Sequence, residues 1–216
     1  MVRAEAEAEI VIPEGLLISM DDETPLGFIV VGLPHVDVDV SDWFYDAVAY
    51  TYLNGIMSST STEQKEFSPE ATTTRAMIVT VLHNLSGKPE AAGATFADVP
   101  EDAWFTDATA WAEAAGIVFG IGDGLFAPDA MITRQDLAVI LMRYAQYAGL
   151  TLPEIRIDRP FADDDAIAGY ARGAVQTLFR AGVISGKPGM IFDPMGQATR
   201  AEVAAMLQRF MEAVGK

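Results

Sequence analysis

Two short stretches near the C-terminus, Phe192-Asp193-Pro194 and Thr199-Arg200-Ala201-Glu202, decide the fold. The first is a turn, and the second is a capping box, in which Thr caps a helix and Glu three residues later reaches back to the cap. The same pair of features occurs twice earlier, at Phe67-Ser68-Pro69 before Thr74-Arg75 and at Phe126-Ala127-Pro128 before Thr133-Arg134. A recurrence every 59 to 66 residues predicts three copies of one supersecondary unit.

The three copies share a second set of positions upstream of the turn. A glycine followed by an aliphatic residue is typical of a helix stop, because glycine adopts the left-handed cap at little cost. Further upstream an aromatic residue opens another apolar stretch. The glycine pairs are Gly55-Ile56, Gly116-Ile117 and Gly182-Val183, and the aromatic residues are Trp43, Trp104 and Tyr170. Each copy therefore predicts a helix, a glycine-containing loop and a second helix.

The second helix of each copy carries a regular apolar stripe at positions i, i+3, i+4 and i+7. A stripe of this width predicts a mainly α fold in which three helix-loop-helix units form a pseudo-threefold arrangement around a central three-helix bundle. The stripes are Ile78, Val81, Leu82 and Leu85; Leu137, Ile140, Leu141 and Tyr144; and Val203, Met206, Leu207 and Phe210. The expected units are residues 36–92, 93–156 and 157–216, with the first helices packed around the bundle.

The sequence of residues 1–35 predicts an extended N-terminal segment, here called the lead-in. Glu5 to Ile10 alternates with period two, and Leu26 to Val31 is a short β-prone run between prolines. Two interpretations remain open, a linker from a larger protein and a strand that packs on the main body.

Composition excludes several classes of function. The 216 residues contain 14 Lys and Arg against 31 Asp and Glu, a net charge of −17 that repels nucleic acids and anionic lipids. No run of 18 apolar residues and no signal peptide is visible, so we expect no membrane insertion and either a cytosolic protein or a piece of a longer exported chain. Cysteine is absent, which removes thiolate catalysis and Cys-ligated zinc.

The arginine after each capping Thr is the candidate binding residue. A cation in the first turn of a helix lies at the positive end of the helix dipole, which costs about 0.3–1 kcal/mol. Arg75, Arg134 and Arg200 all occupy that position, so something negative should face them. One interpretation is an internal acid, drawn from Asp39, Asp98 and Asp163; the other is an external carboxylate held by the guanidinium and free helix amides.

Other candidates have a structural and a functional interpretation. Gly120 and Gly186 in the loops supply either a positive φ angle or a close approach to a ligand. Trp43, Trp104 and Tyr170 are either core anchors or a groove wall for a sugar ring. No metal site, cofactor site or active site is expected, because the Asp-rich segments lack a calcium loop and the two histidines lack a nucleophile nearby.

These residues, in this order, resemble the S-layer homology (SLH) domain, present as three tandem copies over about residues 36–216. The resemblance implies a non-catalytic module that anchors an exported protein to the bacterial cell wall, with grooves between adjacent repeats. It implies an extracellular location in the cell wall or S-layer, and a fragment of a larger surface protein. The ligand it implies is a secondary cell-wall polysaccharide whose terminal sugar carries a pyruvate ketal. By motif it assigns anion contact to Arg75, Arg134 and Arg200, and the loop position near the ligand to Gly120 and Gly186.

The first repeat departs from the pattern. Ser59 stands where the other repeats have Gly120 and Gly186, the loop is two residues longer, and Met77 replaces the capping acid. We therefore expect the groove supplied by the first repeat's arginine and loop to be the weakest. Two further functions remain open, a protein–protein or self-assembly module and a module that binds peptidoglycan.

Overall fold

The computed structural model describes residues 17–19, 30–61, 63–91 and 96–215, which contain six α-helices, one short 3-10 helix and two strands. This mainly α content confirms the predicted fold class. The strands are β1 (Leu17–Ser19) and β2 (Val30–Gly32); the helices are α1 (Tyr45–Leu53), α2 (Arg75–Leu85), α3 (Thr106–Ala114), α4 (Arg134–Tyr147), η1 (Asp164–Ala166), α5 (Gly169–Arg180) and α6 (Arg200–Ala213).

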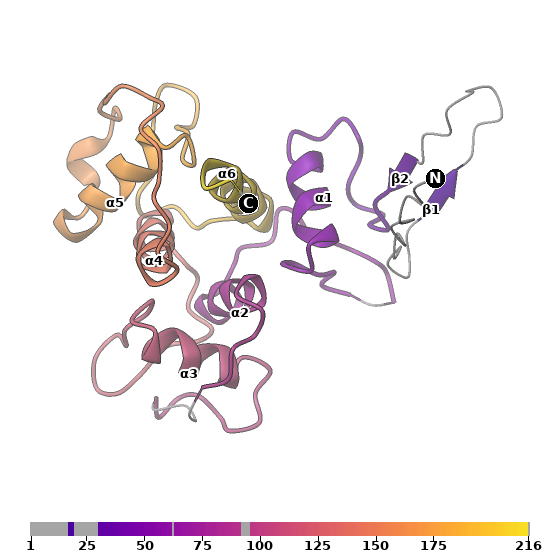
Figure 1. Ribbon diagram of the computed structural model, residues 1–216, viewed down its shortest axis with the longest axis horizontal. Coiled ribbons are helices and arrows are strands. Elements are labelled where there is room, and N and C mark those ends of the chain that lie inside the picture. The colour runs from indigo at the N-terminus through magenta and orange to yellow at the C-terminus, as the bar shows by residue number, and fades with distance from the viewer. Residues whose placement is uncertain (1–16, 20–29, 62, 92–95, 216) are drawn as a thin grey trace, which may run out of the picture.

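The N-terminal lead-in contains one antiparallel pair. Strand β1 pairs with β2 in the register Leu17 with Gly32, Ile18 with Val31 and Ser19 with Val30. The predicted β-prone run is described only in its last two residues, and the alternating segment from Glu5 to Ile10 lies outside the described residues. Figure 1 draws the pair beyond α1, away from the other helices.

The second helix of each repeat begins where the Thr caps predict. Thr74, Thr133 and Thr199 have extended backbone, and each side chain accepts a hydrogen bond from the backbone N–H three residues on. The reciprocal capping box is complete only at Thr199, because Glu202 also accepts from the Thr199 backbone N–H. The predicted helix stops also hold, since Gly55, Gly116 and Gly182 follow α1, α3 and α5 with φ angles of 64°, 68° and 80°.

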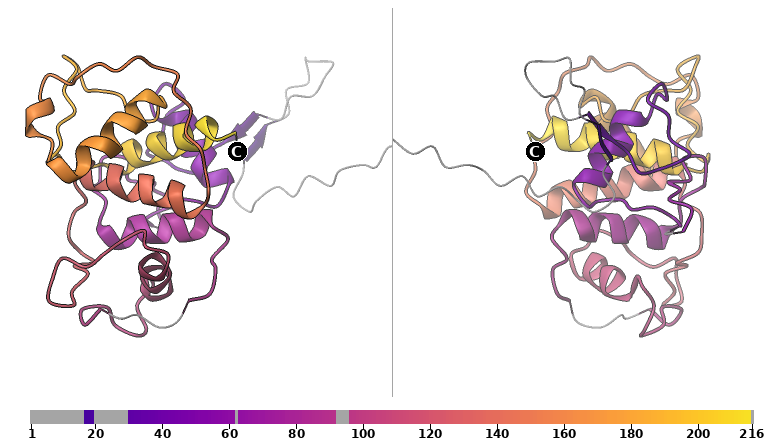
Figure 2. Two further views of the ribbon diagram at one scale, coloured as in Figure 1. Left: turned by 60° about the vertical axis from the view of Figure 1, so that its left-hand side comes forward. Right: turned by 90° about the vertical axis from the view of Figure 1, so that its right-hand side faces the viewer.

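The closest helix pairs join different repeats. Helix α3 packs on α2, α5 on α4, and α1 on α6, so each first helix lies on the second helix of the repeat before it and the first repeat lies on the last. Figure 1 shows α2, α4 and α6 in the middle with α1, α3 and α5 outside them, and Figure 2 shows the three inner helices running side by side. A lobe of this molecule is therefore built from two repeats.

A cycle of backbone hydrogen bonds joins the three repeats at the entry to the inner helices. Thr73 N–H donates to the Ala198 carbonyl, Ala198 N–H to the Ile132 carbonyl, and Ile132 N–H to the Thr73 carbonyl, at 3.0, 3.2 and 2.9 Å. All three residues are buried. Because each link joins a different pair of repeats, the first and last repeats are as directly connected as neighbours in sequence.

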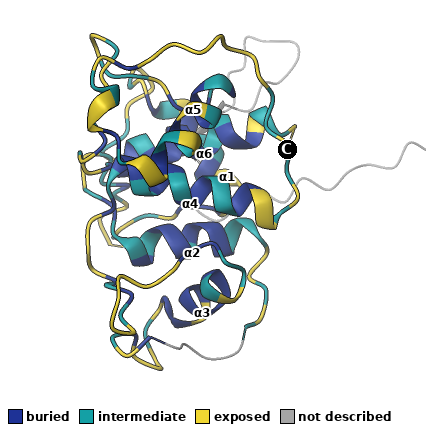
Figure 3. Cartoon of the chain, turned by 90° about the vertical axis from the view of Figure 1, so that its left-hand side faces the viewer, coloured by how far each residue is buried: buried dark blue, intermediate teal, exposed yellow. Residues whose placement is uncertain are grey.

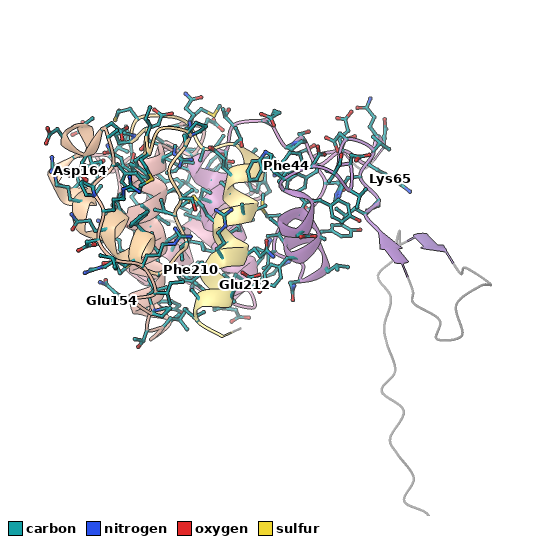
Figure 4. The ribbon with its side chains drawn as sticks, turned by 90° about the horizontal axis from the view of Figure 1, so that it is seen from above. Phe44, Lys65, Glu154, Asp164, Phe210 and Glu212 are labelled. Atoms are coloured by element: carbon teal, nitrogen blue, oxygen red, sulfur yellow. The ribbon has the colours of Figure 1, made fainter. Side chains whose placement is uncertain are left out.

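The core lies along the predicted apolar stripes. Of the twelve stripe residues, eleven are buried, and the partly buried Leu85 still packs on the core. The Phe residues of the three turns, Phe67, Phe126 and Phe192, have no exposed surface. Figure 3 shows the buried faces of the helices turned toward one another, and Figure 4 labels Phe44 next to α6 and Phe210 on α6 itself.

Candidate functional site

Each candidate arginine reaches across to the turn of the next repeat. The Nε atoms of Arg75, Arg134 and Arg200 donate to the carbonyls of Phe126, Phe192 and Phe67, at 2.9, 2.8 and 2.7 Å. Each guanidinium also lies over the ring of the same Phe, with distances to the ring centre of 4.7, 5.4 and 4.5 Å. These groups therefore stabilise the contact between repeats, whatever else they bind.

A carboxylate holds the other side of each turn. Asp98 accepts from the backbone N–H groups of Phe126 and Ala127, both at 2.7 Å. Asp163 and Asp37 make the same pair of contacts in their own repeats. The expected direct pairing of the arginines with Asp98, Asp163 or Asp39 is wrong within the described part of the chain, because the Asp binds the N–H side of the turn and the Arg its carbonyl side. In the first repeat the residue is Asp37, and Asp39 instead accepts from Ser41.

The three arginines differ in burial and in their second partner. Arg134 and Arg200 are 5% and 7% exposed, and Arg75 is half-buried. Arg134 forms an ion pair with Glu202 at 2.8 Å, whereas Arg75 and Arg200 donate their second hydrogen bonds to the carbonyls of Phe119 and Ser58. Burial lowers the pKa of Arg200 to about 10, with nearby Asp37 opposing the shift, so the group stays charged at neutral pH.

A cleft of about 310 Å³, here called cleft A, opens beside Arg134. It combines residues from all three repeats, because the arginine comes from the second, an aromatic from the first and a glycine loop from the third. Its polar and aromatic lining includes Trp43, Arg134, Ser185, Gly186, Lys187, Glu202 and Arg209. Three cations and one carboxylate give this cleft a local positive charge on a strongly acidic chain.

A second cleft of about 180 Å³, cleft B, opens beside Arg75. Its lining repeats that of cleft A one repeat earlier, and includes Arg75, Phe119, Gly120, Asp136, Arg143 and Tyr170. Tyr170 is fixed in this wall, because its hydroxyl donates to Asp136 at 2.6 Å and accepts from Gln135 at 3.1 Å. Local burial and the bond to Asp136 raise the pKa of Tyr170 to about 12.

The structure places the three candidate aromatic residues at the surface. Trp43, Trp104 and Tyr170 are 64%, 63% and 63% exposed, so the core-anchor interpretation is wrong. The residues after the two tryptophans, Phe44 and Phe105, are buried instead. Trp43 lines cleft A and Tyr170 lines cleft B, whereas Trp104 lines neither.

Internal packing leaves little room for a side chain at the two loop glycines. Gly120 and Gly186 do not have a positive φ, so that interpretation is wrong. A Cβ at Gly120 would lie 2.6 Å from the Leu125 carbonyl oxygen and 2.9 Å from the Phe96 ring, and a Cβ at Gly186 would lie 3.2 Å from the Met190 backbone. Each glycine also lines a cleft, so the same position serves both the internal packing of the loop and the shape of the cleft.

The first repeat solves the same packing problem with a different pair. His35 occupies the place of Phe96, two residues before the turn-binding Asp, and its Nε2 lies 3.1 Å from the hydroxyl of Ser59. His35 is buried and packs edge-on against Phe67, although the predicted boundary at residue 35 left it in the lead-in. The smaller ring of His35 therefore leaves room for the Ser59 side chain at the position where the other repeats have glycine.

Sequence reasoning grouped the arginine and loop of one repeat into one groove, and the structure separates them. Arg75 of the first repeat lies in cleft B with Gly120 of the second, whereas Ser59 belongs with Arg200, whose Nη2 donates to Ser58 at 2.7 Å. The expectation of a weak groove built from Arg75 and the first loop is therefore wrong in its composition. Of the two departures from the repeat pattern, Ser59 lies beside Arg200, and Met77 lies on α2.

Sequence reasoning also missed a second arginine in each cleft. Arg143 and Arg209 follow the cleft acids Asp136 and Glu202 by seven residues, which is two turns along one helix face. That spacing was a usable signal, because the corresponding residues of α2 are Met77 and Asn84. The third repeat junction thus has neither the acid nor the second arginine.

Comparison with known proteins identifies the family of two segments. Residues 95–138 and 160–204 match the family model of the S-layer homology domain. Both segments run from the Phe-x-Asp turn partner to the start of an inner helix, and so contain the Asp, Phe-x-Pro and Arg residues described above. The first predicted SLH repeat, residues 36–92, stays a prediction.

Curated relatives carry the match over a larger part of this chain. An amylopullulanase from Thermoanaerobacterium thermosulfurigenes is 32% identical over 82% of the chain, and "S-layer protein sap" of Bacillus anthracis is 31% identical over 70%. A cellulosome-anchoring protein of Acetivibrio thermocellus is 28% identical over 68% of it. The chain spans only 10%, 17% and 33% of these relatives' lengths. That several relatives are surface proteins supports the predicted extracellular, cell-wall location.

None of the described helices is long and apolar enough to cross a membrane. No group of three or more His, Asp and Glu in that part of the chain is placed to hold a metal ion.

Proposed function

We propose that this chain is a non-catalytic SLH module that anchors a larger protein to the bacterial cell wall by binding an anionic polysaccharide in clefts A and B. The observation that carries the proposal is the composition of each cleft, which joins a guanidinium, an exposed aromatic ring and a glycine loop from three different repeats. The amylopullulanase is an enzyme by name, but the chain spans 10% of it, so its catalysis is not transferred.

The clefts suit an acidic sugar for reasons of chemistry. A guanidinium has five N–H donors, and Arg75 uses its Nε and Nη2 groups internally, which leaves its Nη1 group for a ligand. A carboxylate such as a pyruvate ketal accepts such donors in short, charge-assisted hydrogen bonds. The exposed ring of Trp43 or Tyr170 offers an apolar surface to the C–H face of a sugar.

Two clefts on one rigid body also suit a polymer. A single charge-assisted contact with one ring contact supports only micromolar to millimolar binding. Two sites that engage the same wall raise the effective affinity without any new contact. Arg200 and Trp104 line neither cleft A nor cleft B, so the ligand contacts predicted for them are not part of this proposal.

The decisive experiment uses the aromatic residues rather than the arginines. Replacing Arg134 would remove the bond to the Phe192 carbonyl and the ion pair with Glu202, so lost binding could not be separated from lost folding. Trp43 and Tyr170 are exposed, and we expect Trp43→Ala to fold normally. Tyr170→Ala also removes the hydroxyl bonds to Asp136 and Gln135, so its fold is checked by circular dichroism before binding is compared. Trp104→Ala is the matched control, with the same exposure and no place in either cleft.

Binding is measured by co-sedimentation with purified wall sacculi before and after removal of secondary polymer. We expect the Trp43→Ala and Tyr170→Ala variants to bind untreated sacculi about two- to tenfold more weakly, as for loss of one aromatic contact of about 0.5–1.5 kcal/mol. Trp104→Ala should bind like the unmodified protein, and stripped sacculi should bind none of them. Equal binding to stripped sacculi would favour peptidoglycan, and undiminished binding by both cleft variants would favour a protein-contact module.

A further inference from the structure

At one position directly before the loop glycine, clefts A and B differ in whether an aromatic ring is present. Phe119 in cleft B corresponds to Ser185 in cleft A, each directly before the loop glycine. Both side chains are exposed, so neither is needed by the core. The difference therefore changes the cleft and leaves the fold alone.

In cleft B the ring of Phe119 holds the second arginine. The guanidinium of Arg143 lies over that ring, 4.6 Å from its centre. The Phe119 carbonyl meanwhile accepts from Arg75 at 3.2 Å, so one residue contacts both cations of the cleft. Cleft B, where Arg143 is stacked, is the smaller of the two, about 180 Å³ against 310 Å³.

In cleft A nothing holds the second arginine. Ser185 has no aromatic ring, and the Arg209 side chain makes no hydrogen bond, ion pair or ring contact with any described residue. Arg134 and Glu202 neutralise each other in an ion pair. Arg209, on the same side of the cleft, is a charged side chain without a partner among the described residues. It lies about 10 Å along α6 from Glu202, since seven residues separate them.

Arg209 also borders a second space. The same arginine lines a neighbouring open hollow of about 350 Å³, together with Ile155, Arg156, Gly182 and Glu212. Arg156 of that hollow donates to the carbonyl of Ile184, which lines cleft A, at 3.0 Å. Helix α6 thus contributes residues to both spaces, and Arg209 lines both of them.

We infer that cleft A binds two consecutive units of an acidic oligosaccharide, with the second acid on Arg209, whereas cleft B binds one unit. This inference rests on the proposed function, because it assumes that the Arg134 end takes the first carboxylate. Phe119 and Ser185 then set the length of sugar that each cleft accepts.

The experiment reads cleft A by NMR. The chain has three tryptophans, and of these only Trp43 lines cleft A, so its indole N–H signal reports binding there. The probes are a synthetic monosaccharide with one pyruvate ketal and a disaccharide with one acidic group on each unit. Dissociation constants are compared for the unmodified protein, Arg209→Gln and Ser185→Phe, with Arg143→Gln as the matched control in cleft B.

At Trp43 we expect the disaccharide to bind about tenfold more tightly than the monosaccharide, equivalent to about 1.4 kcal/mol. Arg209→Gln and Ser185→Phe should abolish that gain while leaving monosaccharide binding intact, and Arg143→Gln should keep it. Monosaccharide binding with no gain, or a gain that survives Arg209→Gln, would overturn the inference alone. Failure of both sugars to shift Trp43 would overturn the proposed function together with it.

Discussion

Replacing Asp98 by Ala should destabilise the whole molecule, although the residue lies in a surface loop. Its carboxylate accepts the backbone N–H groups of Phe126 and Ala127, both at 2.7 Å, and the Phe126 carbonyl in turn accepts from Arg75. Burial opposes ionisation of Asp98, but these backbone bonds and the charge of Arg75 outweigh it and lower the pKa of the carboxyl. Its loss therefore loosens the junction between two repeats.

The size of the effect follows from those two bonds. A hydrogen bond to a charged group contributes about 1.5–3 kcal/mol, and unsatisfied N–H groups carry a further cost. Since the site is only half-buried and water can replace part of the carboxylate, we expect a loss of about 2–4 kcal/mol in the free energy of unfolding. For a chain of this size that lowers the melting temperature by about 4–16 °C.

Urea unfolding followed by circular dichroism measures the change. Asp102→Ala is the control, because the Asp102 side chain is exposed and forms no hydrogen bond or ion pair with the described residues. It should alter stability by less than about 0.5 kcal/mol. If Asp98→Ala costs less than about 1 kcal/mol, the carboxylate does not hold the turn and the proposed role of the Asp residues is refuted.

Three further outcomes follow from the same contacts. His35→Phe should destabilise the protein because the larger ring meets Ser59, and adding Ser59→Gly should restore much of the loss, which a double-mutant cycle in urea would detect as coupling of about 0.5–3 kcal/mol. Burial, reinforced by Arg200 and opposed by Asp37, lowers the pKa of His35 below its usual 6.5, so the unfolded chain binds the proton more readily than the folded one. The free energy of unfolding should therefore fall as pH drops below 6.5, until the pKa of the folded state is reached. A pH series should show this step in the unmodified protein and lose it in the double variant, which has no His35. Ala127, at φ 56°, is in the left-handed region, so Ala127→Gly should raise stability by about 0.5–1 kcal/mol, whereas Ala162→Gly in an ordinary loop conformation should lower it.

Local features were predictable from the sequence because their causes are local. The caps at Thr74, Thr133 and Thr199 depend on side chains within three residues, and the stops at Gly55 and Gly116 on the conformational freedom of one residue. The apolar stripes were equally predictable, since their spacing follows the period of the helix itself.

The assignment of residues to clefts was beyond the sequence, because it depends on which repeats touch. Arg75 and the Phe126 carbonyl are 51 residues apart, and Arg200 and the Phe67 carbonyl 133. The same limit explains Trp43: an aromatic before a helix predicts burial when a repeat is considered alone, but its neighbour Phe44 takes the core position and the Trp faces another repeat's arginine.

The closed cycle of hydrogen bonds through Thr73, Ile132 and Ala198 limits how this architecture can grow. Repeat proteins that stack in an open line can gain or lose units, but they need special end units to cover the exposed apolar faces. Here α1 covers α6, so both ends of the series are used and no end unit is needed. A fourth repeat inserted into the chain would have no vacant face to join, and a two-repeat truncation would expose two faces at once. Longer surface proteins of this construction would therefore have to add whole triplets rather than single repeats.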